Sequence, residues 1–342
     1  MLSNALSNSL IPQVTVTTCA RLHMGFFDLT SSAGRRFGGL GLAIESPNTQ
    51  VRIRQSKNLV IDAKSGDYVA NIVDNFIKYF NLPKNFSVQV LQNIPQHAGL
   101  GSGTQMALAI GAGLNSLFAL NLSTVQIAAA AMRGRRSGIG IGAFMQGGFL
   151  LDAGKQADKQ GDEFPVITAR HTFPSDWRVL LVLDTAHKGV HGVAELQAFQ
   201  TLAPAKCTMR QMVFERMLPA LQNADLLVFG AYMQELQAYN GDYFAPVQGG
   251  RYASRDVAEA LAWLKNSGVL CVGQSSWGPT GFAILDNKQQ AENLQAQAQL
   301  VFAGKPNISF KVLRGKNTGA SLSGMGVSGL SASELTASEI IA

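Results

Sequence analysis

Residues 94–105 of the chain read Ile-Pro-Gln-His-Ala-Gly-Leu-Gly-Ser-Gly-Thr-Gln, and this glycine-rich stretch decides the fold. It follows a run typical of a strand (86–91) and opens a run typical of a helix (105–120). Glycines let the backbone approach an anion closely, and a helix start offers unpaired N–H groups and the positive end of its dipole. The order therefore predicts a phosphate-binding loop, although a turn that merely needs glycine has the same local pattern.

Hydroxyl groups favour the phosphate interpretation of this loop. Ser102 and Thr104 place donors at the predicted helix start. We predict that the loop binds the phosphate or diphosphate of a substrate, with His97 beside it. Its predicted binding residues are Gly99, Leu100, Gly101, Ser102, Gly103, Thr104 and Gln105.

A second stretch, residues 133–142, combines three arginines with another glycine run: Arg-Gly-Arg-Arg-Ser-Gly-Ile-Gly-Ile-Gly. An arginine near a helix C-terminus is favourable by itself, so a helix cap explains part of this pattern. Three guanidinium groups exceed what a cap needs, and their forks match phosphate and carboxylate oxygens. We predict a second anion site formed by Arg133, Arg135, Arg136 and Ser137.

A third glycine-rich turn, Gly-Gln-Ser-Ser-Trp-Gly-Pro-Thr-Gly-Phe-Ala-Ile-Leu at 273–285, lies between two predicted strands. A hairpin with a Gly-Pro corner explains it as well as a ligand loop does. Gln274, Ser275 and Trp277 are its candidate ligand contacts. Trp277 either stacks on an aromatic ligand or covers the core beneath the turn, and we favour the core.

The composition restricts the class of protein. The 342 residues are 46% hydrophobic and 15% charged, with a net charge of +6, which suits anionic ligands. The basic residues form no long run, so we expect no nucleic-acid partner. Three widely separated cysteines, no visible signal peptide and no long apolar run predict a cytoplasmic protein without a membrane segment.

The alternation of short strands and helices favours two α+β domains over one doubly wound sheet. We place an N-terminal domain at 13–168, which carries the glycine-rich loop, and a C-terminal domain at 169–314. Residues 315–342 are rich in Gly and Ser and lack periodicity, so we expect a mobile tail.

Two of these loops resemble motifs of the GHMP kinase superfamily. Residues 95–104 follow its pattern P-x-x-x-G-L-G-S-S-A, and residues 275–285 follow S-G-x-G-P-T-x-F-A-L, with fitting separation. The resemblance spans about residues 13–314. It implies a two-domain α+β fold, with an S5-domain-2-like N-terminal domain and a ferredoxin-like C-terminal domain.

The chain departs from the kinase pattern at two positions. The second glycine run has no aspartate to handle a substrate hydroxyl, and Gly103 stands where the kinases have a magnesium-binding serine. Both departures argue against simple phosphoryl transfer. Both departures fit another family. Residues 21–29, 34–44, 99–105 and 136–148 together resemble the β-ribofuranosylaminobenzene 5′-phosphate synthases, which are phosphoribosyltransferases of methanopterin cofactor synthesis.

This second resemblance implies a reaction and its partners. Phosphoribosyl pyrophosphate is joined to 4-aminobenzoate through a C–C bond, and carbon dioxide and pyrophosphate are lost. The resemblance also implies Mg²⁺, no organic cofactor, and a homodimer. Alternatives are a small-molecule kinase of the superfamily that uses ATP, or a non-catalytic phospholigand-binding protein. The aromatic acid remains open at this point, because 4-hydroxybenzoate is a close analogue.

The resemblance also assigns residues outside the three loops. Arg21, His23 and Asp28 are the candidate catalytic residues, and Arg36 is expected on the ribose or aromatic side. Asp184 and Glu195 are candidate metal ligands. His187, Lys188 and His191 are candidates for binding pyrophosphate, and the glycines among them argue against a helical zinc site.

Overall fold

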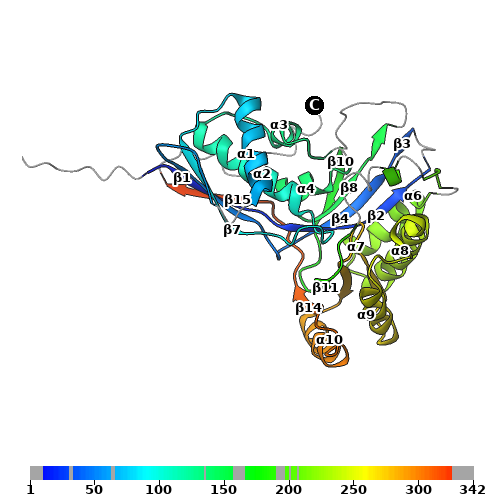
Figure 1. The fold of residues 1–342 in the computed structure, drawn as a ribbon. Helices are drawn as coiled ribbons and strands as arrows, with labels where there is room; N and C mark the ends of the chain where they lie inside the picture. The colour runs from blue at the N-terminus through cyan, green and yellow to red at the C-terminus, as the bar shows by residue number, and fades with distance from the viewer. Residues whose placement is uncertain are drawn as a thin grey trace, which may run out of the picture.

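The structure is a computed structural model that describes residues 11–30, 34–62, 66–134, 136–156, 166–189, 197–199, 202–205 and 208–325. Figure 1 shows helices α1 to α4 on one side of the N-terminal sheets, and the C-terminal strands and helices at the opposite end of the molecule. The arrangement confirms the two-domain α+β prediction. None of the described helices has the length and apolar character that crossing a membrane requires.

Among its described residues, the N-terminal part contains two main sheets and four helices. A five-stranded sheet has the order β15-β1-β5-β7-β6, and a four-stranded sheet has the order β10-β8-β4-β2. The strands are β1 (Gln13–Thr17), β2 (Ala20–Asp28), β3 (Arg35–Arg36), β4 (Gly38–Ile44), β5 (Gln50–Gln55), β6 (Val60–Ile61), β7 (Phe86–Gln92), β8 (Phe149–Asp152), β9 (Lys155–Gln156), β10 (Ile167–His171) and β15 (Ser321–Met325). The helices are α1 (Gly66–Phe80), α2 (Ser102–Phe118), α3 (Thr124–Ala130) and α4 (Ile139–Met145).

Helix α2 packs closely on the five-stranded sheet because it carries small residues. Its interior from Gln105 to Leu114 is buried. A methyl group at Gly113 would lie 2.7 Å from the side chain of Ile53 on β5, so glycine permits this approach. The close packing fixes the direction in which the first turn of α2 points, and that turn carries the glycine-rich loop.

The C-terminal domain has the βαββαβ order of a ferredoxin-like fold. Its sheet has the order β12-β13-β11-β14. Along β11, Leu180 and Val182 pack on α9 and α10, whereas Val179 and Leu181 join a core shared with the N-terminal domain. The elements are β11 (Arg178–Asp184), α6 (Arg210–Met212), the π-helical turn Val213–Met217, α7 (Leu218–Gln222), α8 (Leu226–Gln248), α9 (Arg255–Asn266), β12 (Cys271–Gln274), β13 (Gly281–Leu285), α10 (Lys288–Val301) and β14 (Ile308–Leu313).

The C-terminal residues return to the N-terminal domain. Strand β15 pairs antiparallel with β1, and Gly315 forms a bridge with Ile44. The prediction of a mobile tail from residue 315 is therefore wrong for 315–325, and 326–342 lie outside the described residues. The expected boundary at 168/169 falls inside β10, which pairs with β8. Strand β15 could not be recognised in the sequence because its Gly- and Ser-rich residues show no hydrophobic alternation.

Candidate functional site

The first turn of α2 presents its backbone amides beside the glycine-rich loop. Gly101 precedes the helix with φ 82° and ψ 16°, and as a glycine it has no side chain to cap the helix. Its carbonyl oxygen accepts the amides of Thr104 and Gln105, both over 3.1 Å. Helical geometry leaves the amides of Ser102 and Gly103 without an acceptor inside the helix. This end of α2 can therefore bind an anion through its main chain.

Arg21 on β2 lies directly against the loop. Its Nη1 donates to the carbonyl oxygen of Gly99 over 2.6 Å, and its amide donates to that of Leu100 over 3.1 Å. A methyl group at Gly101 would lie 3.2 Å from the Arg21 side chain, at a residue whose positive φ already disfavours any side chain. A guanidinium group is thus held next to the amides of α2.

The third glycine-rich loop closes over the first. Ser275 lies between β12 and β13 of the C-terminal domain, and its hydroxyl donates to the carbonyl oxygen of Gly99 over 2.7 Å. The same hydroxyl accepts the amide of His23 over 3.0 Å. The geometry unites two of the loops singled out in the sequence, which come from different domains.

Arg133 brings the arginine-rich stretch to the same place. Its Nη2 donates to the hydroxyl of Tyr68 over 3.0 Å, and that hydroxyl donates to the carbonyl oxygen of Gly103 over 3.1 Å. Arg135 lies outside the described residues, and the side chain of Arg136 is exposed. Arg133 is thus joined to the first turn of α2 through Tyr68.

The second glycine run is anchored by a buried carboxylate that the sequence did not point to. Asp152 accepts the hydroxyl of Ser137 over 2.5 Å and the amides of Gly138 and Gly154, each over 2.9 Å, with a longer bond of 3.3 Å from the amide of Gly39. Burial raises the pKa of Asp152 to about 6, against the lowering effect of these donors. Ser137 is therefore occupied in holding α4 to β8.

The side chain of Gln105 also serves packing. It is fully buried, and its Nε2 donates to the carbonyl oxygen of Gly140 over 2.8 Å. This bond links the first turn of α2 to α4. The amide group thus keeps the glycine-rich loop and the second glycine run side by side.

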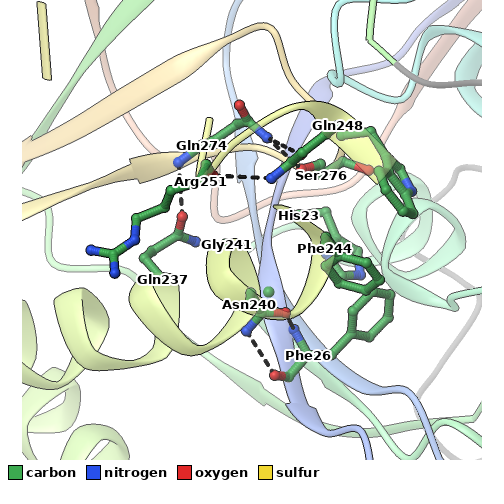
Figure 2. A pocket seen from close by; sticks show the side chains of 12 residues that line it. His23, Phe26, Gln237, Asn240, Gly241, Phe244, Gln248, Arg251, Gln274 and Ser276 are labelled. Atoms are coloured by element: carbon green, nitrogen blue, oxygen red, sulfur yellow. Dashed lines mark hydrogen bonds between the residues drawn. The ribbon is translucent and has the colours of Figure 1, made fainter. Parts of the chain in front are cut away.

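His23 lines a small cavity of ≈ 30 Å³ between β2 and α8, shown in Figure 2. The side chain is 4% exposed, and its Nε2 has no hydrogen-bond partner within the part of the chain that the structure describes. Burial, together with the charge of Arg21, lowers the pKa of His23 to about 3. The imidazole is therefore neutral at ordinary pH, and it can accept or donate a hydrogen bond but carries no charge.

Comparison with known proteins agrees with this geometry. Residues 67–148 match the family model "GHMP kinases N terminal domain", and residues 217–304 match "GHMP kinases C terminal". The β-ribofuranosylphenol 5′-phosphate synthase of Methanocaldococcus jannaschii is 32% identical over 80% of this chain and 90% of its own length. The chain belongs to the β-ribofuranosylphenol 5′-phosphate synthase family.

Other relatives fit this membership. The synthase of Archaeoglobus fulgidus with the same name is 31% identical over 79% of this chain and 87% of its own. Among solved structures, a putative homoserine kinase from Listeria monocytogenes has a TM-score of 0.62 and 17% identity, covering 91% of this chain and 99% of that one. The likeness to the homoserine kinase structure supports the fold alone. The matches to the synthases and to the two family models confirm the resemblance to the synthase family within the GHMP superfamily.

In this member of the synthase family, amide side chains of α8 join the two domains around the cavity. Asn240 accepts the amide of Phe26 over 2.8 Å and donates to its carbonyl oxygen over 2.9 Å. Gln237 donates to the carbonyl oxygen of Met24 and accepts the amide of Gln274. The side chain of Gln274 also bonds within the protein, to Ala253, Gln248 and Ser276, so it holds structure in place.

These α8 residues were not predicted from the sequence. They lie in the second half of α8, which continues to Gln248 through Pro246. Gln237, Asn240, Phe244 and Gln248 recur at helical spacing and line the cavity together. That mixed stripe of amide and aromatic side chains was the available signal.

Two predicted residues, Asp28 of β2 and Arg36 of β3, bond to side chains and backbone outside the three loops. An oxygen of Asp28 accepts the amide and the hydroxyl of Thr30, over 3.0 and 2.7 Å, and so closes a local turn. Arg36 donates to the hydroxyl of Tyr243 over 2.7 Å and to the carbonyl oxygen of Leu202 over 3.2 Å. These contacts give both side chains a structural role, and the predicted catalytic role of Asp28 stays a prediction.

Asp184 is likewise occupied by donors within the protein. It accepts the hydroxyl of Ser254 over 2.6 Å, Nδ2 of Asn307 over 3.0 Å, and the amides of Ala186 and His187. Burial opposes ionisation, but these bonds prevail and lower the pKa of Asp184. Within the described ranges no three His, Cys, Asp or Glu side chains gather as a metal site. The carboxylate of Asp184 is thus held by donors within the protein, and its role as a metal ligand stays a prediction.

The loop that follows Asp184 still approaches the glycine-rich loop. The amide of Gly189 donates to the carbonyl oxygen of His97 over 3.0 Å. The side chains of His187 and Lys188 are exposed on this loop. His191 and Glu195 lie outside the described residues, so their predicted roles stay predictions.

Trp277 belongs to an aromatic cluster. It is 5% exposed, and its ring centroid lies 4.6 Å from that of Phe244 and 5.6 Å from that of Phe199. Trp277 also lines the cavity together with His23. The core role that we favoured from the sequence matches this environment.

Proposed function

We propose that this protein is a decarboxylating phosphoribosyltransferase that joins phosphoribosyl pyrophosphate to a para-substituted benzoate. One observation carries the proposal in a chain of this family: two guanidinium groups approach the start of α2, that of Arg21 beside Gly101 and that of Arg133 beside Gly103. Such a site suits the diphosphate of an activated sugar, because main-chain donors and arginine forks both bind phosphate oxygens.

The proposed chemistry needs a site for a leaving anion and no covalent nucleophile. The bond between the ribose C1 and the diphosphate oxygen breaks, and pyrophosphate leaves with the electron pair. The ring carbon that bears the carboxylate attacks C1, assisted by the electron-donating para substituent. The bond to the carboxylate then breaks, its electrons restore the aromatic ring, and carbon dioxide leaves. Arg21, Arg133 and the α2 amides would stabilise the charge that grows on the diphosphate.

The para substituent is the finer part of the proposal. The family resemblance found in the sequence implies 4-aminobenzoate, which gives an aminobenzene product. The two relatives carry a name that describes a phenol product, which corresponds to 4-hydroxybenzoate. Amino and hydroxyl groups both donate electrons to the para carbon, so a direct comparison of the two acids decides between them.

Magnesium and the homodimer also remain proposals. Because the described residues offer no ready ligand cluster, a magnesium ion would have to arrive with the donor, held by its phosphate oxygens and by water. We derive no step through this ion. Light scattering on the purified protein would test the dimer.

The function is tested with acids labelled in the carboxyl group. The protein is incubated with phosphoribosyl pyrophosphate and either labelled 4-aminobenzoate or labelled 4-hydroxybenzoate, and released carbon dioxide and pyrophosphate are counted. We expect both products in equal amounts, only when donor and acid are present together. Absence of release with both acids contradicts the proposal, and consumption of ATP on an alcohol would identify a kinase instead.

A further inference from the structure

Tyr68 connects Arg133 to the glycine-rich loop, although it lies in α1 and outside every motif singled out in the sequence. Its hydroxyl accepts from Nη2 of Arg133 over 3.0 Å and donates to the carbonyl oxygen of Gly103 over 3.1 Å. The Arg133 guanidinium also lies 6.0 Å from the centre of the Tyr68 ring. One phenol thus fixes the cation relative to the first turn of α2.

Gly103 makes this arrangement possible. A methyl group at this position would lie 3.1 Å from the Tyr68 hydroxyl and 3.3 Å from Nη1 of Arg133. Both distances are shorter than ordinary contacts to a carbon atom, so a side chain here would push the two groups aside. The absence of a side chain at Gly103 therefore lets a hydroxyl and a guanidinium group reach the helix start.

One donor of Arg133 lacks an acceptor. Its Nε is buried and has no hydrogen-bond partner among the residues that the structure describes, and an unpaired buried donor is costly. A phosphate oxygen would satisfy such a donor. Burial raises the pKa of Tyr68 despite the opposing charge of Arg133, so the phenol stays neutral and keeps the proton that it donates to Gly103.

We propose that Tyr68 is a positioning residue that holds Arg133 at the first turn of α2, so that the guanidinium group binds the diphosphate of the donor. This inference rests on the proposed function for the identity of the donor. The positioning role itself can be tested with the diphosphate group alone. Inorganic pyrophosphate is therefore the probe, and its binding can be measured without any turnover.

The test is a double-mutant cycle on pyrophosphate affinity, measured by calorimetry. Tyr68→Phe removes the hydroxyl and keeps the ring, and Arg133→Ala removes the cation. We expect Tyr68→Phe to raise the Kd for pyrophosphate about tenfold, and Arg133→Ala to raise it further. If Tyr68 acts through Arg133, Tyr68→Phe has no additional effect in the Arg133→Ala background.

Tyr79→Phe is the matched control, because Tyr79 lies on the same helix and its side chain is 66% exposed. It should leave the Kd unchanged, and both phenylalanine variants should keep the melting temperature of the wild type. Gly103→Ala is a second variant, expected to displace Arg133 and weaken binding. In kinetic assays Tyr68→Phe should raise KM for phosphoribosyl pyrophosphate more than it lowers kcat.

The outcomes separate the inference from the function. Additive effects of Tyr68→Phe and Arg133→Ala, or a Tyr68→Phe affinity within twofold of the wild type, would overturn the positioning role. If the two variants lose pyrophosphate affinity in a coupled way but the wild type releases no carbon dioxide, the positioning role is supported and the proposed function is contradicted.

Discussion

The hydroxyl group of Ser275 donates a hydrogen bond to the carbonyl oxygen of Gly99 over 2.7 Å. The same hydroxyl accepts the amide of His23 over 3.0 Å. Ser275 belongs to the C-terminal domain, whereas Gly99 and His23 belong to the glycine-rich loop and to β2. The Ser275 side chain therefore links the phosphate loop and β2 to the domain that covers them.

Replacement of Ser275 by alanine should loosen this connection. The buried carbonyl oxygen of Gly99 keeps its bond from Arg21, but the amide of His23 loses its acceptor. We expect a loss of about 1–3 kcal/mol in the free energy of unfolding and weaker binding of phosphoribosyl pyrophosphate. Denaturant unfolding and calorimetry measure both. Ser309→Ala, at an exposed position of β14, is the control; equal behaviour of the two variants would contradict the role of Ser275.

Gly99 should not tolerate a side chain. Its φ is +76°, and a methyl group would lie 2.5 Å from the carbonyl oxygen of Ser275 and 2.9 Å from that of Gly278. Gly99→Ala combines backbone strain of about 1–2 kcal/mol with a clash against rigid backbone. We expect a lower melting temperature and the loss of donor binding. Gly304→Ala, where a methyl group meets nothing within 4 Å, should change neither; a harmless Gly99→Ala would disprove the packing described.

The raised pKa of Asp152 predicts a pH dependence of stability. The pKa is 3.8 for an ordinary aspartate and about 6 in the folded protein, so the folded state binds more protons between these values. The stabilising contribution is complete below about pH 3.8 and is lost as the pH rises through about 6. Asp152→Asn cannot titrate. In denaturant unfolding, the wild type should therefore lose stability relative to this variant from about pH 4 to 6, and parallel curves would refute the assignment.

Asn240 should hold α8 on β2. Its amide group makes two bonds to the backbone of Phe26, at a point where β2 departs from regular pairing with β4. Asn240→Ala leaves both backbone groups buried without a partner, which costs about 1–3 kcal/mol each. Chemical denaturation should reveal this loss, whereas Asn293→Ala on the exposed face of α10 should change stability little. A stability of Asn240→Ala equal to that of the control would rule out this connection between domains.

The sequence predicted the features that depend on local pattern. Glycine order and helix periodicity located the loop before α2, and the arginine-rich stretch and the Ser275 turn were recognised as its neighbours. The contacts of Tyr68 and Asn240 were missed, because each depends on the packing of helices distant in sequence. The family resemblance pointed to Asp28 and Asp184, but their contacts could not be predicted from it. Their donors, Thr30, Ser254 and Asn307, become visible only in three dimensions.

The most direct test of the phosphate site is a crystal structure of the protein with phosphoribosyl pyrophosphate bound. We predict that the diphosphate oxygens lie within hydrogen-bond distance of the Ser102 and Gly103 amides. We further predict that the guanidinium groups of Arg21 and Arg133 lie on either side of the diphosphate. A diphosphate bound away from the first turn of α2, with these amides facing solvent, would contradict the proposed site.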